Sequence, residues 1–175
     1  MTDRVDPELR ADERTSLCQF LDFYRATIVG LAEGLSREQM ATTLPPSTLT
    51  IAGLLKHLAL VEDSWFQEDF LGLPIPAPFA DVDWDADPDW EFRTALDDDP
   101  ADLIAGYEAA CERSRAVVAE LGDLDALSVG TSRRGLTVGE QYSLRWVVLH
   151  LIEETARHLG HADLLRQAAD GATDL

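Results

Sequence analysis

Apolar residues recur at three- and four-residue steps along four stretches of the chain, a spacing typical of helices that bury one face. The first stretch covers about residues 12–35. Its apolar stripe consists of Leu17, Phe20, Leu21, Tyr24, Ile28 and Leu31. The second begins at Thr48 or Thr50, either of which can cap a helix, and continues until Gly72 and Pro74 end it. Since no segment shows a convincing strand-like alternation, we expect an all-α protein.

The third and fourth stretches have clear start and stop signals. The third begins at Pro100, where a proline in the first turn and the preceding "DDD" both favour a helix start, and it ends at Leu121 before Gly122. The fourth begins after Ser143, a suitable cap, and continues to about Ala169. These signals predict two long helices in the second half of the chain.

Between the second and third helices the pattern breaks for about 25 residues. The segment "LPIPAPFADVDWDADPDWEF" is rich in proline and aspartate, which is typical of a loop, and Trp84, Trp90 and Phe92 are candidates to anchor it to the helices. Four helices with one long crossover between helices 2 and 3 predict a four-helix bundle. We expect a single domain over residues 1–175, because a chain of 175 residues with 46% hydrophobic content can bury one substantial core.

The charge balance excludes several partners. The net charge is −19, from 14 Lys and Arg against 33 Asp and Glu, and this charge would repel nucleic acid and anionic lipid surfaces. No apolar run reaches the ~18 residues of a membrane helix, and the acidic opening "MTDRVDPELRADERT" is unlike a signal peptide. We therefore expect a cytoplasmic protein. Cys18 and Cys111 are expected to be small buried thiols rather than a disulfide framework.

The acidic loop resembles a calcium site only in part. Asp81, Asp83 and Asp85 have the spacing of the first three EF-hand ligands. However, the glycine required at the sixth position is Ala86, and the glutamate required at the twelfth is Phe92. A solvated acidic loop is the better interpretation.

The stretch "HLIEETARHLGH" contains the main candidate chemistry. At ~100° per residue, His150, Glu154, His158 and His161 lie on one face of a helix. His150 and His158 are ~12 Å apart along the axis, so only neighbouring pairs can share an ion, and a further ligand must come from another helix. His57, on the apolar face of the second helix, is the remaining histidine. Geometry alone leaves two alternatives, a metal site or histidines that are solvated or singly hydrogen-bonded.

Two motifs resemble a known superfamily. "LTIAGLLKHLALVEDSWF" and "SLRWVVLHLIEETARHLGHADLLR" are similar to the DinB-like proteins, and within them to the mycothiol-dependent, mycothiol S-transferase-like metalloenzymes. The resemblance covers nearly the whole chain, including "ADVDWDADPDWEFR" and "DGAT". It implies a DinB-like four-helix bundle that holds one divalent metal ion.

The resemblance also implies the ligands. DinB-like proteins use one histidine of the second helix and a His-x-x-x-His pair of the last helix. His57 and His158 match this pattern, and Glu154 occupies the middle position. The implied set is His57, Glu154 and His158, with zinc as the first candidate and nickel or iron as alternatives. Four further residues are expected behind the ligands or in the cavity: His161, His150, Arg157 and Trp65.

The activity implied by the resemblance is thiol transfer. A metal ion with an open position favours the thiolate form of a bound low-molecular-weight thiol, such as mycothiol or bacillithiol, which then adds to a small electrophile or supports an isomerisation. The partners are thus a small-molecule thiol and an electrophile, and a homodimer is an option. The alternative is a non-enzymatic metal-binding stress or scaffold bundle. A dinuclear carboxylate site would need Glu-x-x-His motifs on two helices, and the second helix has none.

Overall fold

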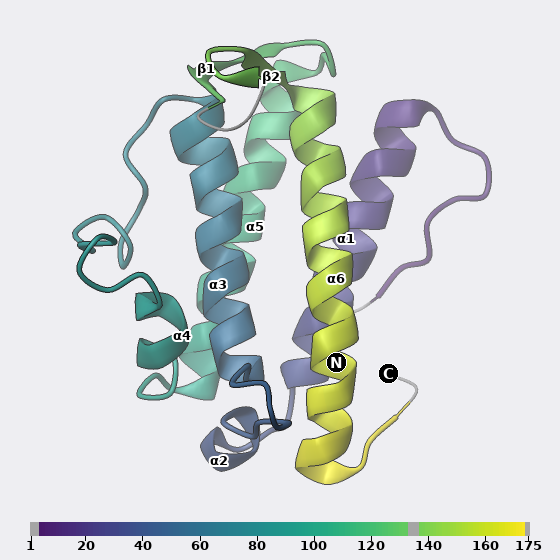
Figure 1. Cartoon of the computed structure of the whole chain (residues 1–175). Helices are drawn as coiled ribbons and strands as arrows, with labels where there is room; N and C mark the ends of the chain where they lie inside the picture. The colour runs from purple at the N-terminus through teal and green to yellow at the C-terminus, as the bar shows by residue number, and fades with distance from the viewer. Residues whose placement is uncertain (1–3, 133–136, 174–175) are drawn as a thin grey trace.

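The computed structural model describes residues 4–132 and 137–173, and most of this part is helical (Figure 1). Its four long helices are α1 (Glu13–Ala32), α3 (Ile51–Asp63), α5 (Pro100–Leu121) and α6 (Leu144–Asp170). These are the four helices that the periodicity predicts, so the expectation of a mostly helical protein is confirmed. Within the described residues, no helix combines the length and the apolarity that crossing a membrane requires.

The predicted helix ends agree closely with the structure because the capping signals act locally. The side chains of Thr50, Asp99 and Ser143 each accept a hydrogen bond from a backbone N–H in the first turn of α3, α5 and α6. Pro100 occupies the start of α5, and Gly122 ends this helix with a left-handed backbone (φ 69°). Thr50, rather than Thr48, is therefore the cap of the second long helix.

Three short elements were not anticipated. Helix α3 continues directly into a π-helix, η1 (Ser64–Phe70), and two short helices, α2 (Arg37–Met40) and α4 (Trp90–Thr94), lie in the connections. A π-helix has i→i+5 hydrogen bonds, so its side chains project in a register that an α-helical stripe does not predict.

The structure also contains a small two-stranded sheet that the sequence pattern does not reveal. The strands β1 (Leu127–Thr131) and β2 (Gln141–Ser143) pair antiparallel in the connection between α5 and α6. The usual alternation is inverted here, because Ser128 is buried while Leu127 and Val129 are 60% and 68% exposed. The Ser128 hydroxyl donates to the Gly130 carbonyl and accepts from the Tyr142 amide. A strand with a polar inner residue gives no hydrophobic signal.

The long helices pack most extensively as two pairs, α1 with α6 and α3 with α5, and α3 also contacts α6 (Figure 1). The predicted stripes form much of the core, since Ile28, Leu54 and Leu58 are fully buried. Phe20 does not follow the prediction and is 46% exposed. It lies at the edge of the stripe of α1, ~100° around the helix from the buried Leu21.

A buried ion pair also connects α1 to α3. The guanidinium of Arg25 donates to both carboxylate oxygens of Glu62, over 2.7 and 2.6 Å, and both side chains are almost completely buried. Arg25 also pairs with the partly exposed Asp22 over 2.9 Å, but the buried Glu62 depends on Arg25, because without it the carboxylate would lose its bidentate partner.

The crossover between α3 and α5 lies against the helices. As expected, Trp84, Trp90 and Phe92 are partly buried and pack on the core. Lys56 of α3 contacts this segment through an ion pair with Asp98 (2.5 Å) and by lying over the ring of Trp90 (4.5 Å to its centroid). The segment that contains α4 is therefore fixed on the same part of α3 that carries His57.

Candidate metal centre

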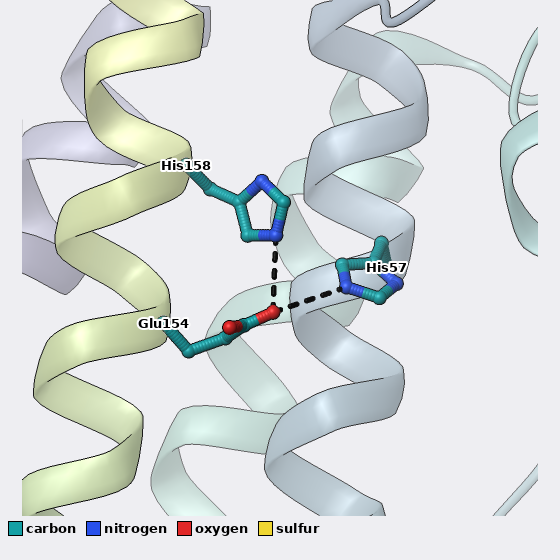
Figure 2. A group of neighbouring side chains, drawn as sticks. All are labelled: His57, Glu154 and His158. Carbon is teal, nitrogen blue, oxygen red and sulfur yellow. Dashed lines mark hydrogen bonds and ion pairs between the residues drawn. The ribbon is translucent and has the colours of Figure 1, made fainter.

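Three potential metal ligands converge between α3 and α6. His57 projects from α3, and Glu154 and His158 project toward it from α6 (Figure 2). Glu154 Oε1 lies 3.6 Å from His57 Nε2 and 3.1 Å from His158 Nε2, and all three ligand atoms are within 4.8 Å of one another. The residues that the family resemblance implies as ligands are thus brought together, although they come from distant parts of the chain.

The spacing of these atoms suits a small divalent ion. A tetrahedral zinc ion with bonds of about 2.0–2.1 Å places its ligand atoms roughly 3.3–3.5 Å apart. The two distances from Glu154 Oε1, 3.1 and 3.6 Å, lie on either side of this value. Two imidazoles and one carboxylate are also a donor set that zinc uses when it keeps a position open.

The hydrogen-bonding polarity of His57 gives a second reason to expect a metal ion at this cluster. His57 Nδ1 lies 3.1 Å from Glu91 Oε1. In the tautomer whose Nδ1–H donates to this carboxylate, Nε2 directs its lone pair toward Glu154 Oε1. Two acceptor atoms that face each other repel, and a cation between them removes that repulsion. The residues present therefore fit a divalent metal ion.

The titration of Glu154 and His158 favours their coordinating forms. Burial raises the pKa of Glu154, but the neighbouring His158 and His57 lower it by more, so the pKa of Glu154 lies below the ordinary 4.5. Burial and the nearby His57 lower the pKa of His158 below the ordinary 6.5, although Glu154 opposes them. A carboxylate and a neutral imidazole, the forms that bind metal ions, are thus present at neutral pH.

Two of the four other predicted residues lie next to the cluster. His161 Nδ1 is 3.4 Å from His158 Nδ1, on the side of that ring away from Glu154. Arg157 is mostly exposed, and its Nη1 lies 3.6 Å from Glu154 Oε2. Its guanidinium also pairs with Glu153, which agrees with the surface ion pair that is the plainer interpretation of this residue.

The other two, His150 and Trp65, lie apart from the cluster. Their rings are 4.7 Å apart between centroids, and Trp146 stacks on His150 at 5.1 Å. Both line a cavity of about 920 Å³, a size suited to a small molecule. Four rings form one wall of it: Trp65, Tyr142, Trp146 and His150.

One residue, Glu154, connects the cavity to the His57–Glu154–His158 cluster. Glu154 belongs to both, whereas His57 and His158 are not part of the cavity lining. Sequence reasoning missed Tyr142 and Trp146 in this wall. The four-residue spacing of Trp146 and His150 was the available signal for Trp146, because such residues follow one another along a helix face; Tyr142 lies in β2 and gives no such signal.

The cysteines are poorly suited to act as nucleophiles. Cys111 is buried, and burial together with the adjacent Glu62 raises the pKa of its thiol well above the ordinary 9.0. Cys18 is half-buried rather than buried, and burial raises the pKa of its thiol as well. The thiolate is the reactive form, so neither side chain is activated at neutral pH.

The long helices and the His–Glu–His cluster beside a cavity define the class of the molecule, a mostly helical protein with a candidate mononuclear metal centre between two helices. The chain belongs to the mycothiol-S-transferase family, whose sequence model matches residues 16–171. The resemblance inferred from the motifs of α3 and α6 is thereby confirmed. No curated protein matches the chain significantly.

Proposed function

We propose that this protein is a metal-dependent thiol S-transferase that joins a low-molecular-weight thiol, mycothiol in the first place, to a small electrophile. The observation that carries the proposal is the position of Glu154, which belongs both to the His57–Glu154–His158 cluster and to the lining of the cavity. A co-substrate in the cavity would therefore lie beside the candidate ion. The transferase family to which the chain belongs supports this function over a non-enzymatic scaffold.

In this proposal the chain's own residues hold the metal ion and form the substrate cavity beside it. His57, Glu154 and His158 would hold a divalent ion, zinc in the first place, which would bind the thiol sulfur and lower its pKa so that the thiolate forms near neutral pH. Two neutral imidazoles and one carboxylate contribute a single negative charge, which leaves net positive charge beside the sulfur. The aromatic wall of the cavity would hold apolar parts of the substrates and exclude water.

The family match also supports a proposal for the overall organisation of the chain. We propose that α1, α3, α5 and α6 form a four-helix bundle of the DinB type and that residues 1–175 are one domain. The two helix pairs and the contact between α3 and α6 support this arrangement.

The test combines elemental analysis with a thiol-consumption assay. We expect one divalent ion per purified chain, and consumption of mycothiol with a panel of small electrophiles. Activity should disappear on chelation and return when zinc is restored. Cobalt substitution adds a direct readout, because a thiolate that binds the ion changes its ligand-field spectrum.

The outcomes separate the two candidate functions. An ion held by His57 and His158, with neither thiol consumption nor a spectral change with mycothiol, bacillithiol or simpler thiols, would support the scaffold. A wild-type protein that binds no divalent ion would contradict both functions.

A further inference from the structure

The crossover segment contributes a buried acid to the candidate metal centre. Glu91, in the short helix α4, is 5% exposed, and its Oε1 lies 3.1 Å from His57 Nδ1. Within the described residues, its second oxygen, Oε2, is buried and has no hydrogen-bond partner. Burying a carboxylate costs free energy unless hydrogen bonds or a positive charge compensate it. If this side chain served only to pack against its neighbours, an apolar or amide side chain would do so at lower cost.

The contacts around α4 show that Glu91 is fixed in place. Phe92, the next residue, stacks on the His57 ring with centroids 4.9 Å apart. A Cβ atom at Gly53 would lie 3.0 Å from Phe92 Cδ1, so glycine allows this close approach of α4 to α3. The ion pair of Lys56 with Asp98 secures the following turn. The ring of His57 is thus held on one face by Phe92 and at Nδ1 by Glu91.

We propose that Glu91 is a positioning residue for metal binding. Its carboxylate accepts from His57 Nδ1–H and so holds Nε2 toward Glu154 Oε1 and His158 Nε2, in the tautomer that can donate a lone pair to an ion. This inference rests on the proposed metal site. It adds that the crossover segment, through Glu91, holds one of the proposed ligands in place. The cost of burying Glu91 is offset when His57 binds a cation, because the ring then becomes more positive.

The test measures zinc affinity by competition with a chelator, without reference to turnover. Outer partners of ligating histidines contribute about 10–100-fold to metal affinity. We expect Glu91→Gln, which keeps the shape and one acceptor oxygen, to weaken zinc binding by about 10-fold, and Glu91→Ala by up to about 100-fold. Far-UV circular dichroism of Glu91→Gln establishes that this near-isosteric variant is folded.

A matched control separates positioning from docking of the segment. Asp98→Asn removes the ion pair with Lys56 but leaves the contacts of Lys56 with Thr94 and Trp90, which hold α4 itself. Glu91 and His57 also stay intact, and we expect the zinc affinity of this variant to stay within about twofold of wild type. In the zinc-loaded protein, NMR of ¹⁵N-labelled histidines should show the Nδ1 proton of His57 protected from solvent exchange. In Glu91→Ala that proton should exchange rapidly.

Two results would overturn the inference: wild-type affinity in both Glu91 variants, or a loss in Asp98→Asn as large as that in Glu91→Gln. A parallel zinc titration of His158→Ala shows whether the metal site or only the role of Glu91 is wrong. If it loses zinc while the Glu91 variants do not, only the positioning role is wrong. If wild type itself binds no zinc, the proposed function and the positioning role both fail.

Discussion

Replacing His158 by alanine is the most direct test of the candidate metal centre. The change removes Nε2, one of three candidate ligand atoms, and with it the 3.1 Å contact to Glu154. Zinc binding by a four-ligand protein site is worth about 10–16 kcal/mol, or roughly 3 kcal/mol per ligand if it is shared equally. Since 1.4 kcal/mol is a factor of ten, we expect zinc affinity to fall by about 100-fold or more.

The loss can be measured through stability as well as through chelator competition. Zinc at about 100 times the wild-type Kd should stabilise the folded wild-type protein by about 2.7 kcal/mol. At that concentration a variant with 100-fold weaker binding would gain only about 0.4 kcal/mol. Urea unfolding with and without zinc distinguishes these values readily.

His150→Ala is the matched control, because it removes a histidine from the same helix that packs on Trp65 and Trp146 outside the cluster. We expect it to bind zinc as wild type does. Wild-type zinc affinity in His158→Ala, or an equal loss in both variants, would show that the cluster is not the metal site.

Three further predictions follow from the same structure. Glu154→His should retain metal binding but shift the preference toward softer ions, measured by competition between metals, because imidazole is neutral and softer than carboxylate; complete loss of metal would assign Glu154 another role. In the ion-free protein, the pKa values of His158 and Glu154 lie below 6.5 and 4.5. The unfolded state therefore binds more protons as the pH falls, so urea unfolding should show stability decreasing below about pH 6.5 and again below about pH 4.5; a flat profile from pH 7 to 4 would contradict these shifts. Glu62→Ala should lower the free energy of unfolding by up to about 3–5 kcal/mol, because it leaves the buried Arg25 with only the partly exposed Asp22 as an ion-pair partner, whereas replacing both Arg25 and Glu62 with apolar residues should recover most of the loss.

The elements that were predicted correctly are those with local signals. Thr50, Pro100, Gly122 and Ser143 each determine a helix end through contacts within one turn, so the sequence pattern is sufficient to place them. Helix geometry left the convergence of His57 with α6 as one of two alternatives, and the family resemblance favoured it. Periodicity assigns a residue to a face, but it does not say which helices will face each other.

The features that were missed depend on contacts between distant segments or on inverted patterns. Glu91 reaches His57 across 34 positions, from a short helix in a crossover segment whose path no periodic pattern describes. The buried Ser128 gives β1 the opposite of a strand's usual signal. The register of η1 follows from a π-helix that propensity does not reveal, although the place of Trp65 in the cavity was expected.

The location of the cluster between the two helix pairs has a consequence for the unfolded chain. His57 and His158 are separated by about 100 residues, and they belong to the α3–α5 and α1–α6 pairs respectively. An ion held by both would close a covalent-like loop of that length, and for a permanent cross-link such a loop removes about 4.7 kcal/mol of chain entropy from the unfolded state. The metal ion would then act as a reversible cross-link between the two helix pairs. The supply of metal would therefore affect the stability of the folded protein as well as its proposed activity.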